Sequence, residues 1–151
     1  MSMSGLRIVL AGSVGSSRLT LQALLRHRAN VVGVLELQPD DPSAISGFAR
    51  LYDVAAEANV PCVGFQKLNE PEIVSQVREW QPDLLFAVGL SQLVKAELIA
   101  VPRLACIGFH PTHLPRGRGR APVAWLVLDA VPGAATFFVM DEGADSGPIL
   151  V

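Results

Sequence analysis

Short apolar runs alternate with amphipathic stretches along almost the whole chain. Apolar runs typical of buried strands cover residues 6–11, 31–35, 60–65, 84–88, 104–109 and 136–140. Helical spacing predicts a first helix that carries Leu19, Leu21 and Leu24 and is capped by Ser16 or Ser17, and further helices at 47–59, 71–80, 93–100 and 122–129. Strands that are continuously apolar and alternate with helices indicate an α/β fold whose parallel sheet is covered on both faces.

The composition fits one globular domain spanning residues 1–151. Half of the residues are hydrophobic, 17% are charged and the formal net charge is −2. This balance predicts a buried core and provides no basic field that would attract nucleic acid. No run approaches the ~20 apolar residues of a membrane helix. Residues 1–7 lack the features of a signal peptide, so a cytoplasmic location is expected.

The two cysteines, Cys62 and Cys106, lie in apolar surroundings. We expect both to be buried free thiols in a reducing compartment. No Cys/His spacing indicates a zinc site, so no metal is expected.

A histidine stands at the predicted carboxyl end of a strand. His110 follows the apolar run Leu104–Ile107, and open α/β sheets bind ligands at that edge. Two prolines stiffen the loop after it, and arginines then alternate with glycines in Arg116–Arg120. This setting favours a functional site, although a structural hydrogen bond explains His110 equally well when it is taken alone.

A second segment, Met140–Leu150, places Asp145 before Ser146-Gly147, where an ordinary turn would also favour an aspartate. Together with Gly108–Pro115 and Arg118–Pro122, it resembles the folate-dependent formyltransferase family. The motifs of that family are roughly Asn-x-His-Pro-Ser-Leu-Leu-Pro, Arg-Gly-x-x-Pro and Asp-x-Gly-x-Ile. The family includes methionyl-tRNA formyltransferases, glycinamide ribonucleotide transformylases and sugar-nucleotide N-formyltransferases.

The resemblance covers about Ile8 to Val151 and implies a Rossmann-like three-layer sandwich. The family fold continues beyond the strand that Ile149–Val151 begins, so we expect a catalytic domain that lacks its last elements, either minimal or C-terminally truncated. A homodimer is one way to cover the surface that such a missing element leaves.

The implied activity is transfer of a formyl group from 10-formyltetrahydrofolate to a primary amine. His110 matches the family's active-site histidine and would manage proton transfer and stabilise the oxyanion. Asp145 matches the family's aspartate and would tune that ring.

The same resemblance implies a folate pocket after the strand at 84–88. Such a pocket combines apolar lining with a few backbone polar groups. A strand-to-helix loop in which Ser91 only caps is an equal alternative. The residues implied are Phe86, Val88, Gly89, Leu90, Ser91, Gln92 and Asp141.

Thr112, Arg118 and Arg120 are expected to bind the acceptor. Arginines spaced by glycines can grip phosphate oxygens, although a solvated basic loop has the same composition. The segment Arg118–Pro122 resembles the sugar-nucleotide branch of the family more than the tRNA-directed branch. This resemblance predicts that the acceptor is an amino sugar on a nucleotide. Methionyl-tRNA and a ribonucleotide amine are alternatives, but the near-neutral charge counts against tRNA.

Ser13 lies in a turn after the first strand. In the glycinamide ribonucleotide branch a comparable turn binds substrate phosphate, so Ser13 is a candidate phosphate ligand. A tight strand-to-helix connection is the simpler explanation. The turn lacks the third glycine of the dinucleotide fingerprint, and Glu36 is the only acidic candidate on the second strand for an NAD site.

Gly108 departs from the family pattern, which has asparagine there to hold the formyl oxygen. Loss of one such donor costs about 100- to 1,000-fold in rate. Three explanations are open: Gln92, Thr112 or His113 supplies the donor; the protein is slow or moves another carbon unit; or it binds folate or nucleotide without turnover. We prefer the first, because His110 and Asp145 are both present.

Overall fold

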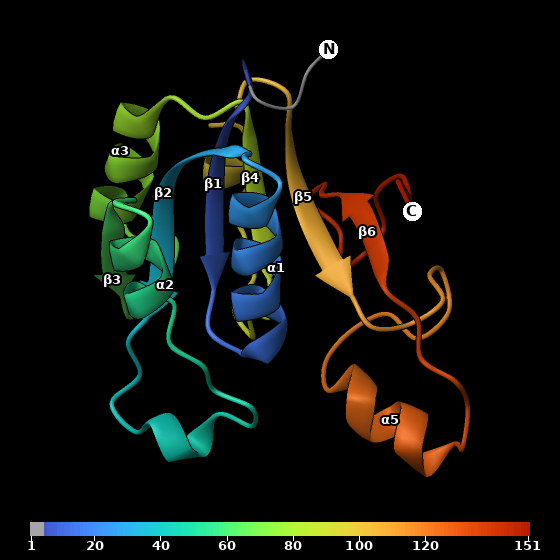
Figure 1. The fold of residues 1–151 in the computed structure, drawn as a ribbon. Helices are drawn as coiled ribbons and strands as arrows, with labels where there is room; N and C mark the ends of the chain where they lie inside the picture. The colour runs from blue at the N-terminus through green and yellow to red at the C-terminus, as the bar shows by residue number, and fades with distance from the viewer. Residues whose placement is uncertain (1–4) are drawn as a thin grey trace.

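The structure is a computed structural model that describes residues 5–151 (Figure 1). Residues 1–4, which contributed to the signal-peptide argument, lie outside the described residues. Six strands form one sheet in the order β3-β2-β1-β4-β5-β6. All neighbouring pairs are parallel except β5 and β6, which are antiparallel. The strands are β1 (Arg7–Gly12), β2 (Asn30–Leu37), β3 (Cys62–Phe65), β4 (Leu84–Val88), β5 (Ala105–His110) and β6 (Thr136–Val139).

Helices cover both faces of the sheet. Leu21 of α1 (Gly15–Arg26) and Val54 of α2 (Tyr52–Glu57) belong to one hydrophobic cluster. Ile73 of α3 (Pro71–Trp80) and Leu98 of α4 (Ala96–Ile99) belong to the other. The predicted three-layer α/β sandwich with a mostly parallel sheet is confirmed.

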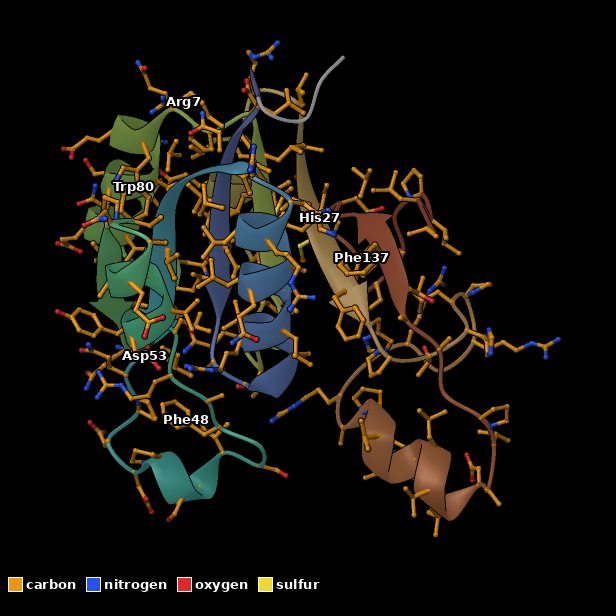
Figure 2. All side chains as sticks on the ribbon, in the orientation of Figure 1. Arg7, His27, Phe48, Asp53, Trp80 and Phe137 are labelled. Atoms are coloured by element: carbon orange, nitrogen blue, oxygen red, sulfur yellow. The ribbon has the colours of Figure 1, made fainter. Side chains whose placement is uncertain are left out.

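Two predicted helices are shorter in the structure. The segment predicted as helix 47–59 becomes helical only at Tyr52, because Gly47 has a φ of 71° and Phe48 pairs with Val14 in an isolated bridge (Figure 2). The helix predicted at 93–100 is reduced to α4, because Asn69 forms hydrogen bonds with backbone groups of the segment that precedes α4. Its side chain donates to the Leu93 carbonyl and accepts from the Lys95 amide.

The cap predicted for the first helix was wrong. The residue that precedes α1 is Val14, and Ser17 lies inside the first turn. The Ser17 hydroxyl accepts from the Ser13 and Val14 amides and donates to the Val88 carbonyl. It therefore joins the end of β1 to the end of β4.

Glu36 is a buried carboxylate at the end of β2, with 2% of its surface exposed. Its Oε2 accepts hydrogen bonds from the Leu51 and Tyr52 amides, and Arg50 lies 3.3 Å from Oε1. The carboxylate thus holds the start of α2. Because both oxygens are engaged, it is not free to bind a ribose, which agrees with the sequence argument against an NAD site.

The last residues pair with the outer edge of β6. The Phe137 amide donates to the Val151 carbonyl at 2.7 Å, and the Leu150 amide donates to the Phe137 carbonyl at 2.8 Å. The expectation that Ile149–Val151 begins a strand agrees with these bonds. Helix α5 (Pro122–Leu128) lies apart from the sheet in Figure 1 and buries none of its residues.

The two cysteines differ in their surroundings. Cys106 is buried as expected, whereas Cys62 is only partly buried, so the prediction is wrong in part. Burial raises the pKa of the Cys106 thiol to about 12 and that of Cys62 to about 11. Both are therefore thiols rather than thiolates at neutral pH, which is typical of structural cysteines.

Candidate active site

His110 ends β5 and points into the protein, with 6% of its surface exposed. Its Nε2 lies 2.8 Å from the carbonyl oxygen of Gly117. Because a carbonyl can only accept, Nε2 carries the proton of this bond. The other ring nitrogen, Nδ1, lies 3.6 Å from Oδ2 of Asp145.

Asp145 is brought to His110 by the loop after β6. Its backbone has a φ of 51°, in the left-handed region, which aspartate tolerates better than most residues. Oδ2 accepts a hydrogen bond from the Gly119 amide at 2.9 Å, and the Asp145 carbonyl accepts one from Nε of Arg118 at 3.0 Å. The side chain keeps 21% exposure, and its separation from His110 exceeds hydrogen-bond length.

Gly117, Arg118 and Gly119, here called the glycine clip, hold the pair together. The clip touches His110 through the Gly117 carbonyl and Asp145 through the Gly119 amide and Arg118. Both glycines have positive φ, 70° and 98°. The sequence predicted that glycine spacers let backbone approach an anion. In the structure, one anion they approach is Asp145.

Thr112 lies under the glycine clip and is 3% exposed. Its hydroxyl donates to the Arg116 carbonyl at 2.8 Å and to the Gly117 carbonyl at 3.3 Å. Its own carbonyl accepts from the Thr136 hydroxyl of β6 at 2.6 Å. The side chain predicted to bind substrate is therefore engaged inside the protein.

The space beside Gly108 is occupied. A Cβ at this position would come within 2.6 Å of Cζ of Phe138 and 3.1 Å of Cγ of Met140. Phe138 is 2% exposed, so it cannot turn aside without opening the core. The place of the family's asparagine side chain is thus filled by apolar groups from the neighbouring strand and its end.

The three side chains suggested as replacement donors are directed elsewhere. The Gln92 amide accepts from the Leu68 amide at 2.8 Å and donates to the Gln66 carbonyl at 2.6 Å. His113 is exposed, and the Thr112 hydroxyl donates to the Arg116 carbonyl beside the clip. Within residues 5–151, none of the three forms a side-chain hydrogen bond to the side chains of His110 or Asp145.

The segment predicted to line a folate pocket divides into core and loop. Phe86 and Val88 belong to the cluster beneath α1, and Val88 has no exposed surface, so these two side chains contribute to packing. Gly89 to Gln92 form the loop at the carboxyl end of β4, where Leu90 is half-buried and Ser91 is exposed. This loop remains the predicted folate contact.

Ser13 connects this loop to the first turn. It is 2% exposed, and its hydroxyl donates to the Gly89 carbonyl at 3.0 Å. The hydroxyl is thus already engaged, as a tight strand-to-helix connection requires.

Asp141 orders the loop that carries Asp145. Its Oδ1 accepts from the Ser146 hydroxyl at 2.7 Å and from the Gly143 amide at 2.9 Å, and these bonds lower the pKa of the carboxyl group. Arg120 is exposed after the clip. The sequence could not reveal the clip itself, because its contacts run through backbone atoms, although the Gly-Arg-Gly spacing was a signal of close approach.

Two surface hollows lie away from His110. One, of about 280 Å³, lies between α1 and α2, and the other, of about 270 Å³, lies near the start of β4. In the described part of the chain, no three His, Cys, Asp or Glu side chains are grouped to hold a metal ion. No helix of residues 5–151 is long and apolar enough to cross a membrane.

The chain is similar in sequence to known formyltransferases. Residues 7–151 match the formyl transferase family. The chain is 34% identical over 155 residues to a methionyl-tRNA formyltransferase of Geobacter metallireducens, covering 99% of this chain and 49% of that protein. A methionyl-tRNA formyltransferase of Clostridioides difficile is 28% identical, with 97% and 48% covered. The chain spans about half the length of the curated relatives it matches.

Solved structures share the fold. The phosphoribosylglycinamide formyltransferase of Bacillus halodurans superposes with a TM-score of 0.77 at 20% identity, covering 96% of this chain and 77% of that one. A sugar N-formyltransferase of a Shewanella species gives 0.67 at 18% identity, with 97% and 55% covered. The family match over nearly all of the chain establishes that this protein belongs to the formyl transferase family.

Proposed function

We propose that this chain transfers a formyl group from 10-formyltetrahydrofolate to a primary amine. The observation that carries the proposal is the convergence of His110, at the end of β5, and Asp145, from the loop after β6, with Nδ1 and Oδ2 3.6 Å apart. Membership of the formyl transferase family supports the same chemistry.

The donor fits the loop after β4. Leu90 is half-buried and Ser91 is exposed there, so the loop combines apolar and polar surface, as a flat heterocycle requires. When bound, 10-formyltetrahydrofolate would supply an activated formyl carbon. Residues 89–92 would hold it, and Asp141 would order the loop that carries Asp145.

His110 and Asp145 would handle the protons. The attacking amine must lose a proton and the departing nitrogen must gain one. A proton on Nδ1 of His110 lies opposite the Asp145 carboxylate, which stabilises it, and the ring can return it later. Because the Nδ1–Oδ2 separation is longer than a hydrogen bond, Nδ1 is not tied to Asp145, and it is the ring nitrogen that we propose takes the proton of the amine.

The acceptor we propose first is an amino sugar carried on a nucleotide, with Arg118 and Arg120 near its phosphates. Arg118 uses Nε for Asp145, so its contact with phosphate would couple the acceptor to the catalytic pair. Methionyl-tRNA is the second candidate. It is favoured by the 34% identity to a protein named as a methionyl-tRNA formyltransferase.

The test is formylation followed by mass spectrometry, with 10-formyltetrahydrofolate and either a panel of nucleotide amino sugars or methionyl-tRNA. We expect His110→Asn to lower kcat by about 100- to 10,000-fold, the usual contribution of a general acid–base group, and Asp145→Asn to lower it as well. His27→Ala is the matched control, because His27 is exposed at the end of α1.

The outcomes separate the candidates. Formylation of one nucleotide amino sugar supports the first acceptor, and formylation of methionyl-tRNA alone replaces it with the second. Turnover that survives His110→Asn would contradict the proposed mechanism. Folate binding without turnover on any amine would instead establish the binding-only alternative.

A further inference from the structure

We propose that Thr112 is a positioning residue that selects Nδ1 of His110 as the nitrogen that handles protons. The catalytic consequence rests on the proposed function, but the geometry of the ring does not. The Thr112 hydroxyl and the His110 ring meet at one carbonyl, that of Gly117. Thr112 itself is 3% exposed and out of reach of a substrate.

Thr112 fixes the clip at two neighbouring carbonyls. Its hydroxyl donates to Arg116 O at 2.8 Å and, at the longer distance of 3.3 Å, to Gly117 O. The methyl group packs against the same residue, since a Cβ on Gly117 would come within 2.9 Å of Cγ2 of Thr112. Contact on both sides restricts the orientation of the Gly117 peptide.

Thr112 is itself anchored to the sheet. The Thr136 hydroxyl of β6 donates to the Thr112 carbonyl at 2.6 Å. The Gly117 carbonyl is therefore held in place by Thr112, which is in turn held by β6. Because one lone pair of this oxygen accepts from Thr112, the other is left for Nε2 of His110.

This carbonyl determines the tautomer of the ring. The hydrogen bond made by one histidine nitrogen decides the state of the other. Nε2 must keep its proton to donate to Gly117 O at 2.8 Å, so in the neutral ring Nδ1 is the free base. Nδ1 faces the Asp145 carboxylate across 3.6 Å, so the free base lies beside a negative charge that favours its protonation.

The experiment is NMR of the full chain with ¹⁵N-labelled histidine, at a pH where the rings are neutral. The chain has three histidines, and His27→Ala and His113→Ala assign the signals. We expect wild type and Thr112→Ser to show His110 as the Nε2–H tautomer. Thr112→Val should show a mixture of tautomers.

Thr20→Val is the matched control. The Thr20 hydroxyl also donates to a backbone carbonyl, that of Ser16 at 2.8 Å, but inside α1. Gly117→Ala is a second route to the same result, because its methyl group would push against Thr112 and its φ of 70° disfavours alanine. A single Nε2–H tautomer in both Thr112→Val and Gly117→Ala would overturn the proposal.

Kinetics add a separate test. We expect Thr112→Val to lower kcat by about tenfold, the size of one neutral hydrogen bond, with KM for the folate donor little changed. Thr112→Ser should restore kcat. If turnover requires His110 but Thr112→Val leaves the tautomer of His110 unchanged, the positioning role of Thr112 is refuted and the proposed function is not. If the tautomer of His110 depends on Thr112 but the protein formylates no amine, the proposed function is refuted and the positioning role of Thr112 is not.

Discussion

At the scale of single residues, backbone groups hold the His110–Asp145 pair. The ring donates to the Gly117 carbonyl, and the carboxylate accepts from the Gly119 amide. Backbone dipoles of this kind keep their direction as charge develops, which is what an acid–base pair requires. Substitutions at Gly117 and Gly119 are therefore expected to act through backbone geometry, whereas a substitution of Arg118 removes its own hydrogen bond to Asp145.

Gly108 is the residue where this chain departs from the family motif, and the structure assigns a packing role to that departure. A Cβ there would lie 2.6 Å from Phe138. We expect Gly108→Ala to destabilise the fold by about 1–3 kcal/mol, the usual cost of overpacking a core. Urea unfolding of the purified variant measures this loss.

Gly15→Ala is the matched control, because a Cβ at Gly15 meets nothing within 4 Å. The double variant Gly108→Ala with Phe138→Leu should recover part of the loss, since leucine vacates the space of the ring tip. Wild-type stability in Gly108→Ala would contradict the view that Phe138 fills this place.

At the scale of elements, polar side chains outside two of the helices decide where these helices begin. The pattern predicted α3 from Pro71, because proline suits the first turn of a helix. For α2 and α4, the boundary depends on Glu36 and Asn69, which capture backbone groups across the fold. The hydrophobic pattern alone therefore predicted the positions of α2 and α4 correctly but overestimated their lengths.

The carboxylate of Glu36 is the strongest such contact. Glu36→Ala leaves the Leu51 and Tyr52 amides without their acceptor, and an unsatisfied buried donor costs about 1–3 kcal/mol. We expect a loss of stability of at least that size, with faster amide hydrogen exchange in α2 than in α3.

Glu57→Ala is the control for this variant, because Glu57 is exposed at the other end of α2. Unchanged exchange at Leu51 and Tyr52 in Glu36→Ala would show that the carboxylate does not hold the helix start.

At the scale of the whole molecule, aspartates join distant elements and make the fold sensitive to acid. The hydrogen bond from Arg18 of α1 lowers the pKa of Asp53 in α2 to about 2 (Figure 2). The Arg7 amide, and then Arg103, lower the pKa of Asp83 at the start of β4. These contacts connect the two helices of one layer and the ends of neighbouring strands.

We expect stability to fall as the pH drops below about 4. In the unfolded chain an aspartate titrates near 3.9, so on acidification the unfolded state binds protons before the folded state does. The contribution of Asp53 is complete above that value and is lost as pH falls toward about 2. Urea midpoints measured from about pH 6 down to about pH 2, the range that spans the titration of aspartates, test this expectation.

Asp53→Asn and Asp83→Asn should each make the loss of stability below about pH 4 less steep, because each removes a carboxyl group whose pKa is lowered in the folded state. Added salt should weaken the Asp53 effect, because its side chain is 55% exposed. If the urea midpoint of both variants falls with acid as steeply as that of the wild type, Asp53 and Asp83 are not the source of the acid sensitivity.

Much of the fold was predictable because hydrophobic pattern is a local property. Residues 84–88 were predicted as a strand from their apolar run alone, and β4 has those bounds. His110 was placed at a strand end for the same reason, and β5 ends there. Asp145 was associated with His110 by resemblance to family motifs rather than by any local signal, since 34 residues separate the two.

The amino-acid pattern was enough to predict the alternation of strands and helices, the mostly parallel sheet and the two segments that carry His110 and Asp145. Contacts in three dimensions were needed to learn that Thr112 supports the clip, that Phe138 fills the space at Gly108 and that Gln92 turns to the loop before α3. These outcomes depend on contacts between residues distant in the chain and on backbone atoms, which carry no side-chain signature. Periodicity records which face a residue buries, but not which atom it meets there.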